Sequence, residues 1–533
     1  MDLQRNFFIL LFIIVSFFLW KEYKKETLIQ PEISKEEVNT SNFSNYKDED
    51  FNNISVNTDV LSLKINMRGG DIVEANLNNY KKDLNSKESF GLLHTSPSFL
   101  YHAKSGLIGK DGLDNFNSNK RPIYQADQKL FKLKKDKTEL RVPIWFLSKK
   151  NILYRKIFIF KKGKYDVNID YDILNLSKKK IEIQLLNELQ QNANVLETEK
   201  NKYKQNLMLH TFRGTAYSSL QNNFKKYKFE DIISNKQLSV KTNTGWIAMV
   251  QQYFSTAWIP KEKNIIDYIY TFKSKKNLVN IAYISKKIYI NPNSHKKISS
   301  ILWIGPEIQD KMRLLAPNLD LTIDYGWFWF ISHPLFQLLR YLYRLVGNWG
   351  ISIMLITLII KLLMYPLTRV QYKSMIKMRK IQPKIDLIKE KFSNDKRKLS
   401  QEIMMLYQKE KINPLGGCLP VLLQMPIFLG LYYMLTSSIE LRHAPFLLWI
   451  RDLSSYDPYY ILPILMGLSM FLTQKTSLND ISDPMQKKAM YFMPFIFVFF
   501  FLWFPSGLVL YYISNNLITM IQQKLILNSS LKK

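Results

Sequence analysis

Cysteine is almost absent from this chain of 533 residues, in which Cys418 is the single example. A lone cysteine excludes an intramolecular disulfide, so any domain outside the cytosol must be stabilised by its own core. Enzyme motifs are also missing. The sequence has no HExxH, GxSxG or GxxxxGK[ST] pattern, and GLIGKDG at Gly106 has the wrong spacing for a phosphate-binding loop. These absences predict no catalytic residue, no cofactor and no metal site.

Acidic residues are few beside the basic ones. The chain has 75 Lys and Arg against 44 Asp and Glu, a net charge of +31. Such a balance is typical of nucleic-acid binding, of contact with anionic lipid, or of lysine-rich codon usage. Lysine, asparagine and isoleucine recur along the whole chain, which favours codon usage. No CxxC, RNP-like or zinc-finger spacing is present, so we expect no nucleic-acid partner.

Long apolar runs are confined to the N-terminus and the C-terminal part, although the mean hydropathy of the whole chain is only −0.16. We expect the first run to be an uncleaved signal anchor, because no small-x-small cleavage site follows it. Together the runs predict six membrane spans: Phe7 to Trp20, Ile351 to Leu367, Leu415 to Ile439, Tyr459 to Thr473, Ala489 to Phe504 and Gly507 to Leu527.

The basic residues between the spans predict their orientation. The segment 369–411 holds 13 Lys and Arg against 5 Asp and Glu, so we place it in the cytoplasm. Counting outward from it, both termini lie in the cytoplasm and the large segment after the first span lies outside the inner membrane.

The part before the second span predicts an all-β domain. Residues 1–23 form the expected anchor helix, and the polar stretch 24–56 is expected to be a flexible linker. Apolar residues then alternate on both sides of Gly69-Gly70, which indicates a β-hairpin. Similar short runs up to Ile290 predict a β-sandwich over 57–326. Its histidines show no metal-ligand spacing.

A polar stripe marks the segment 327–346 as an amphipathic helix. His333, Gln337, Arg340 and Arg344 recur on one face of an otherwise aromatic and leucine-rich sequence. We expect this helix to lie in the bilayer interface; the alternative is an ordinary helix that packs domains together. The remaining residues, 347–533, contain five of the six predicted spans.

Three of these spans carry polar side chains. Lys361 lies about 10 Å from the cytoplasmic end of the second span at 1.5 Å per residue, where a charge costs roughly 2.5–3.5 kcal/mol. Snorkelling toward the headgroups would explain Lys361 alone. It does not explain the other polar residues, which recur at helical spacing or stand between prolines: Thr357 and Tyr365 in the second span, Gln424 in the third, and Tyr512, Asn516 and Thr519 in the last. They predict a hydrated cavity or, if scattered, separate interhelical hydrogen bonds.

The cytoplasmic segment 369–411 predicts a basic helical hairpin. Apolar residues Ile381, Ile385, Ile388 and Phe392 are followed by a break at 393–395 and by a second amphipathic run. A solvated charged face is the alternative to a contact surface. We assign contacts with ribosome, lipid or an emerging chain to Lys377, Arg379, Lys380 and Lys384.

Several long motifs in this sequence resemble the YidC membrane-protein insertases of Gram-negative bacteria. They are GNWGISIMLITLIIKLLMYPLT, MRKIQPKI, INPLGGCLPVLLQMPIFLGLYYML, DLSSYDPYYILPILMG and FFLWFPSGLVLYYISNNL. The N-terminal MDLQRNFF and the segment VLSLKINMRGGDI also resemble this family, so the resemblance spans essentially the whole chain.

The resemblance implies a polytopic α-helical membrane protein with a five-helix insertase core and a large periplasmic all-β supersandwich domain. It implies a groove open to cytosol and lipid, to which we assign Lys361, Thr357, Gln424, Tyr511, Tyr512, Asn516, Thr519 and Trp503. Gram-negative relatives usually have Arg where this chain has Lys361. Lysine keeps the charge but lacks the planar guanidinium that binds a carboxylate with two hydrogen bonds.

The predicted function is therefore that of an insertase and chaperone of the inner membrane, without ATP hydrolysis and without enzyme activity. The implied partners are nascent membrane proteins, the Sec translocon with its accessory subunits, the ribosome and the bilayer. A small-solute channel or secondary transporter is the alternative, but it predicts polar residues through the outer half of the spans, and the fifth span is fully apolar. An envelope enzyme with a sugar-binding sandwich is a further alternative.

Overall fold

The computed structural model describes residues 53–96, 99–114, 121–194, 212–234, 236–274, 277–392, 395–410, 419–478 and 484–531. The predicted anchor helix 1–23 and most of the predicted linker 24–56 lie outside these residues. The chain divides into two compact units, one that ends at Asp324 and one that continues from Tyr325. Each unit is described by itself.

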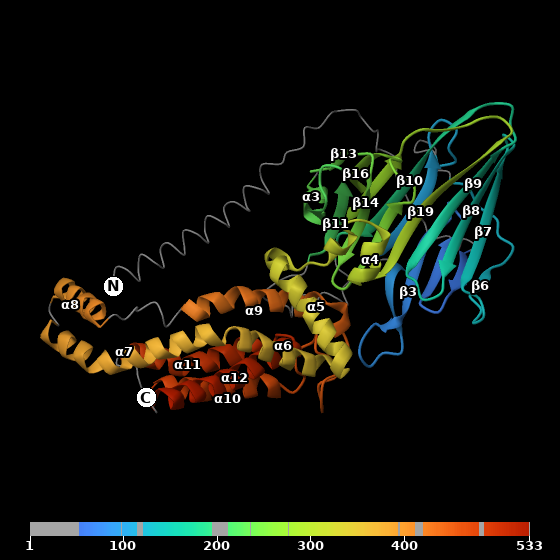
Figure 1. Ribbon diagram of the computed structural model, residues 1–533. Coiled ribbons are helices and arrows are strands. Elements are labelled where there is room, and N and C mark those ends of the chain that lie inside the picture. Colours follow the sequence, from blue (N-terminus) through green and yellow to red (C-terminus); the bar gives the residue numbers. More distant parts are fainter. Residues whose placement is uncertain are drawn as a thin grey trace. The chain divides into compact units, whose positions relative to one another are not determined.

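The first unit is built from two largely antiparallel β-sheets (Figure 1). Eleven strands form one sheet in the order β13-β16-β17-β10-β5-β4-β3-β2-β1-β6, with β18 paired to β10. Their bounds are β1 Asn53–Asn57, β2 Leu61–Asn66, β3 Asp71–Lys81, β4 Ser89–Thr95, β5 Leu100–Ile108, β6 Leu130–Lys132, β10 Ile181–Asn192, β13 Ser239–Lys241, β16 Ile266–Ser274, β17 Leu278–Ser285 and β18 Ile288–Ile290.

Eight strands form the other sheet, in the order β12-β11-β14-β15-β19-β9-β8-β7. Their bounds are β7 Glu139–Ser148, β8 Ile152–Lys161, β9 Asp166–Asn175, β11 Gly214–Ser219, β12 Lys225–Lys228, β14 Gly245–Gln251, β15 Phe254–Pro260 and β19 Ser294–Pro306. Short helices α3 (Phe229–Ile233) and α4 (Gln309–Leu315) complete this unit.

Polar side chains join the two sheets inside the apolar core. The indole nitrogen of Trp258 on β15 donates to the carbonyl oxygen of Glu188 on β10 over 3.1 Å. The hydroxyl groups of Tyr101 on β5 and Thr256 on β15 lie 2.5 Å apart. Buried tyrosine and tryptophan side chains need such partners, because an unpaired polar group in an apolar interior loses its hydration without compensation.

The predicted hairpin around Gly69-Gly70 is confirmed, because β2 and β3 pair antiparallel with Asn66 opposite Asp71. Gly69 and Gly70 adopt φ angles of +77° and +64°, which a side chain at Cβ would disfavour. The sheet also contains β1, which pairs with β2. The prediction that the linker extends to residue 56 is wrong at its end, because Asn53 already begins a strand.

The second unit is helical. Its elements are α5 Trp329–Val346, α6 Trp349–Leu363, α7 Tyr365–Lys391, α8 Lys396–Lys409, α9 Leu419–Ser437, α10 Ile461–Leu478, α11 Pro484–Phe501 and α12 Ser506–Leu531. Helix α12 contacts α6, α7, α9 and α10, so it is the helix around which this unit is organised (Figure 1). Helix α5 packs on α6 and α9, and α11 packs on α10.

Among the described residues, no single helix combines the length and the hydropathy that a bilayer crossing requires. Helix α6 and the first part of α7 meet that requirement only together, as Trp349–Leu363 and Tyr365–Met378, with a bend of 60° between them. Shorter apolar segments are Ile461–Gln474 and Tyr491–Phe501.

The second predicted span, from Ile351 to Leu367, is wrong as one straight helix. Helix α6 ends at Leu363 and α7 starts at Tyr365. Pro366 explains the break, because proline has no amide hydrogen to donate to the carbonyl four residues earlier, and its ring clashes with that carbonyl. Tyr365 therefore belongs to the next helix and does not extend the polar face of α6.

Candidate functional site

Lys361 lies in the last turn of α6 and is almost completely buried, with 7% of its surface exposed. The helix begins at an Asn348 cap, whose side-chain oxygen accepts from the amide of Ile351 over 3.1 Å. Thr357, one turn before Lys361, is also buried and donates its hydroxyl to the carbonyl oxygen of Ile353 over 2.6 Å. Within the described part of the chain, no side chain forms an ion pair with the Lys361 ammonium.

Helix α9 is joined to α12 by polar side chains. The amide nitrogen of Gln424 donates to the side-chain oxygen of Asn515 over 2.8 Å. The aromatic ring of Tyr512 packs edge-on against Phe428 of α9 and Phe501 of α11, with centroid distances of 5.1 Å and 4.8 Å. Tyr511 is buried in the same turn of α12.

The polar side chains that were predicted to share one face of α12 do not all bond to the same partner. Asn516 donates its amide to the hydroxyl of Ser469 on α10 over 3.0 Å. Thr519 donates to the carbonyl oxygen of Asn515 within its own helix over 2.6 Å. Asn516 therefore bonds to α10, whereas Asn515 bonds to α9. The helical spacing therefore predicted one polar face from residues that bond to different partners.

Gln522 connects the last part of α12 directly to the residue that carries the charge. Its amide nitrogen donates to the backbone carbonyl oxygen of Lys361 over 3.1 Å, and its side chain is buried. Asn515 and Gln522 are seven residues apart, so their two bonds are separated by about 10 Å along α12. Helix α12 is therefore bonded to α9 through Asn515 and to α6 through Gln522.

Trp503 is not part of this hydrogen-bonded group. It follows α11 and is 38% exposed, with its ring edge-on to Phe499 at a centroid distance of 5.0 Å. It belongs to the exposed aromatic surface of α11.

The predicted hairpin corresponds to α7 and α8, which contact each other. Buried Ile381 and Ile385 pack against Met378, Ile403, Leu406 and Tyr407. Lys377 and Lys380 are exposed, and Lys384 forms an ion pair of 2.7 Å with Glu410. The backbone of Arg379 lies in α7, but its side chain is outside the description. Residues 393 and 394 of the predicted break also lie outside it.

Comparisons with known proteins cover nearly the whole chain. Residues 341–533 match the family described as 60Kd inner membrane protein, and residues 53–338 match the one described as YidC periplasmic domain. A protein of Buchnera aphidicola subsp. Schizaphis graminum (strain Sg), named membrane protein insertase YidC, is 55% identical over 99% of both chains. The chain belongs to the YidC family.

A second YidC, from Buchnera aphidicola subsp. Baizongia pistaciae (strain Bp), is 50% identical over 100% of both chains. A crystal structure of an active YidC insertase with its first transmembrane domain resolved is 19% identical, with a TM-score of 0.38 over 89% of this chain and 92% of that one. YidC membership makes the chain an inner-membrane protein with a periplasmic domain. It also makes the chain an insertase and not an enzyme, and gives no support to a solute channel.

Sequence reasoning missed Asn515, Gln522 and Ser469 in this YidC core. Asn515 stands next to Asn516, and the series Tyr511, Asn515 and Gln522 has the spacing i, i+4 and i+11, so it forms a second polar stripe. Two overlapping stripes on one helix are the signal for contacts with more than one neighbour.

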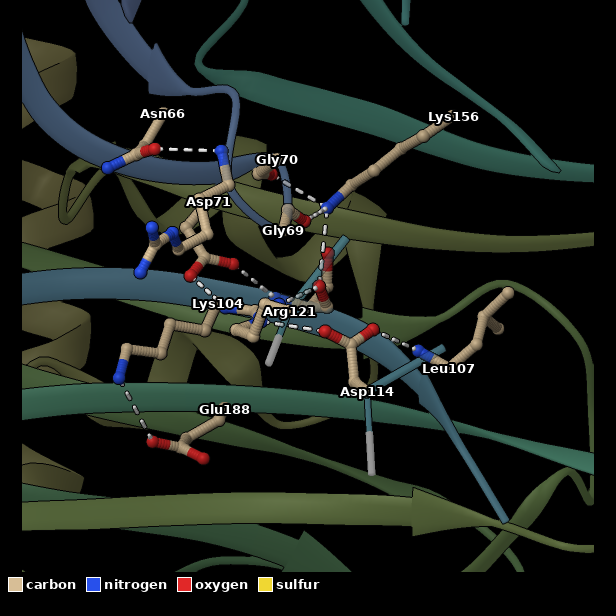
Figure 2. A network of polar contacts seen from close by, with 12 residues as sticks. Asn66, Gly69, Gly70, Asp71, Lys104, Leu107, Asp114, Arg121, Lys156 and Glu188 are labelled. Carbon is tan, nitrogen blue, oxygen red and sulfur yellow. Dashed lines mark hydrogen bonds and ion pairs between the residues drawn. The ribbon is translucent and has the colours of Figure 1, made fainter. Parts of the chain in front are cut away.

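The YidC periplasmic domain contains a buried charged network that the sequence did not predict (Figure 2). Arg121 lies between Asp71 and Asp114 and donates to both carboxylates, the second over 2.7 Å. Lys156 donates to the carbonyl oxygens of Gly70 and Gly69 over 2.7 Å and 3.2 Å. These residues come from β3, β8 and the segment between β5 and β6, so the network connects the two sheets.

The charged groups of this network pair with one another or with backbone carbonyl oxygens. Among the described residues, no group of three or more His, Cys, Asp or Glu side chains is arranged to hold a metal ion. Burial lowers the pKa of Lys156 to about 7, while its three carbonyl acceptors, which include Ser105, match the three protons of the charged form. Each charged side chain labelled in Figure 2 has a hydrogen-bond or ion-pair partner, which is typical of a structural network.

Proposed function

We propose that this protein inserts membrane proteins into the inner membrane through a polar groove formed by α6, α9 and α12 in the inner half of the bilayer. The observation that carries this proposal is the pair of hydrogen bonds by which Gln424 and Lys361 are both joined to α12. The helices that carry Lys361 and Gln424 are therefore both bonded to α12. The proposed groove residues are Lys361, Thr357, Gln424, Tyr511, Tyr512, Asn516, Thr519 and Trp503.

A polar tail of the substrate enters the groove from the cytoplasm and is held near Lys361 and the amide side chains. Its path through hydrocarbon is shortened, which lowers the barrier to crossing. The apolar segment of the substrate then moves into lipid. Twenty apolar residues at about −0.3 to −0.6 kcal/mol each supply on the order of −6 to −12 kcal/mol, so no nucleotide is needed.

The membrane arrangement belongs to the same proposal. We place six spans in the bilayer, with both termini and the α7–α8 hairpin in the cytoplasm. The hydropathy runs and the 13 basic residues of 369–411 support this orientation. We assign contacts with a ribosome, lipid headgroups or an emerging chain to Lys377, Arg379, Lys380 and Lys384. Lys377 and Lys380 are exposed, and Lys384 is exposed but pairs with Glu410. The Sec translocon is a further proposed partner.

Substitution of Lys361 tests the groove. Lys361→Ala and Lys361→Glu should reduce insertion of a short single-span substrate in cells depleted of the native insertase, whereas Lys361→Arg should keep it. Site-specific crosslinking from Gln424 and Tyr512 to a stalled nascent chain locates the substrate. Full insertion by Lys361→Glu, or crosslinks to neither residue, would show that the groove is not used.

Deletion of residues 60–300 provides the matched control for the periplasmic domain. All proposed groove residues lie in the helical unit, so we expect insertion to remain largely intact. Complete loss of insertion, with the shortened protein present in the membrane at normal amount, would place the function in the sandwich instead.

A further inference from the structure

The bend between α6 and α7 follows Lys361 directly in the chain, because α6 ends two residues later. Helix α6 ends at Leu363, and the backbone amide of Met364 donates to the carbonyl oxygen of Ile360 over 3.0 Å. Helix α7 then departs at 60°. The carbonyl groups of a last helical turn lack regular partners, and Pro366 removes the amide that would have reached Leu362.

Gln522 of α12 supplies a hydrogen-bond donor at this point. Its amide nitrogen lies 3.1 Å from the carbonyl oxygen of Lys361, and the contact is buried. Helix α12 also contacts both α6 and α7, the two arms of the bend. In one continuous helix, the carbonyl of Lys361 would accept from the backbone amide four residues later. At the bend it lacks that donor, so the bond from Gln522 stabilises the bent conformation.

The free oxygen of the same side chain strengthens this assignment. The Oε1 atom of Gln522 is buried and has no hydrogen-bond partner among the described residues. Among the described residues, the bond to Lys361 is therefore the one hydrogen bond that this side chain makes. A volume-matched apolar side chain would fit the space but would lose that bond.

We infer that Gln522 is a positioning residue, which sets the angle between the helix that carries Lys361 and the α7–α8 hairpin. This inference rests on the proposed function for its biological meaning, but the angle itself is a structural quantity. Gln522 does not touch the substrate. It acts through Lys361 and through the direction in which the hairpin leaves the helical unit.

The angle is measured on the full chain in lipid nanodiscs by pulsed electron paramagnetic resonance. Cys418 is replaced by serine, and spin labels are attached at Met354→Cys on α6 and Leu387→Cys on α7, both of which are exposed positions. Gln522→Met keeps the volume and removes the donor. Ser514→Ala is the matched control, because its buried hydroxyl bonds within its own helix, to the carbonyl oxygen of Leu510.

We expect Gln522→Met to widen and shift the distance distribution and to reduce the insertion rate about threefold, the factor that one average interhelical hydrogen bond represents. Ser514→Ala should change neither. A Gln522→Met distribution equal to that of the parent chain overturns the inference. If that variant is not recovered folded, Gln522→Asn, whose shorter side chain cannot reach the carbonyl, is measured in the same way and by hydrogen exchange at the α6–α7 junction.

The two proposals fail separately. If Lys361→Glu abolishes insertion while Gln522→Met leaves both the distances and the insertion rate unchanged, the groove stands and the role of Gln522 is refuted. If Gln522→Met alters the distances while Lys361→Glu inserts normally, Gln522 sets the bend and the groove is refuted.

Discussion

The side-chain amide of Gln424 on α9 donates to the side-chain oxygen of Asn515 on α12 over 2.8 Å. The two residues are 91 positions apart in the chain. One was expected from its place between two prolines, and the other was not. Their bond fixes α9 against α12 at the level of the proposed groove, so the groove has a defined wall without an ion pair.

A double-mutant cycle tests this bond. Gln424→Leu and Asn515→Leu should each lower the free energy of unfolding in detergent, and the double variant should lose less than the sum. Interhelical hydrogen bonds in membrane proteins give a coupling energy of about 0.6 kcal/mol and at most about 1.7 kcal/mol. Asn516→Leu with Gln424→Leu is the control pair and should be additive, because Asn516 bonds to Ser469. Additivity in the first cycle would refute the bond.

The charged network of the periplasmic domain predicts a large stability effect. Lys156→Met removes the ammonium that serves Gly69, Gly70 and Ser105 and leaves their carbonyl oxygens buried without this donor. A buried hydrogen-bonding group that loses its partner costs about 1–3 kcal/mol. The loss is measured by thermal unfolding of the full chain, followed by fluorescence of the buried tryptophans of the sandwich.

Lys150→Met is the control for this substitution. Lys150 forms an ion pair of 3.2 Å with Asp111, but its side chain is 67% exposed. Exposed ion pairs contribute about 0–1 kcal/mol, so this variant should unfold close to the parent chain. Equal effects of the two substitutions would mean that the buried network does not stabilise the domain.

Glu307 predicts a pH dependence of stability. This residue follows β19 and is buried, and its Oε1 atom has no hydrogen-bond partner in the part of the chain that the structure describes. Burial raises the pKa of its carboxyl group from an ordinary value of 4.5 to about 8. Between pH 4.5 and 8 the carboxyl group therefore keeps its proton in the folded state and loses it in the unfolded state. The free energy of unfolding consequently falls as the pH rises through this range.

The measurement is the free energy of unfolding at pH 5, 6.5 and 8 for the parent chain and for Glu307→Gln. The difference between the two proteins isolates Glu307, because all other titrating groups are shared. We expect the parent chain to lose up to about 1.4 kcal/mol per pH unit relative to the variant within this window. A difference that is constant with pH would show that the carboxyl group titrates normally.

Much of the architecture was predictable from local pattern. The alternation in Leu61, Leu63 and Ile65 predicted β2, and the glycine pair that follows predicted the turn to β3. In contrast, β14 and β15 read as GWIAMVQ and FSTAWIP, with neither alternation nor a clear turn between them. Both faces of these strands are buried, so the period of two that marks a half-exposed strand is lost.

Strand β10 shows that polar residues can also hide a buried strand from sequence-based prediction. Its apolar alternation stops at Leu186, but the strand continues to Asn192 through buried Asn187, Glu188, Gln190 and Gln191. Polar residues suggest solvent when the chain is read alone. Here two of them bond to the neighbouring strand β17: Gln190 donates to Asn280 over 2.7 Å, and Asn187 donates to the hydroxyl of Tyr283 over 2.5 Å.

The sequence by itself determined the composition-driven features of this protein: an N-terminal β domain, a C-terminal set of apolar helices, a basic hairpin and a charge at Lys361 within an apolar run. These follow from hydrophobic period and charge, which act along the chain. Tertiary structure alone decided that Asn515 bonds to α9, that Asn516 bonds to α10 and that Gln522 reaches the carbonyl group of Lys361. Hydrogen-bond partners depend on which helix stands opposite a side chain, and no spacing within one helix encodes its neighbour.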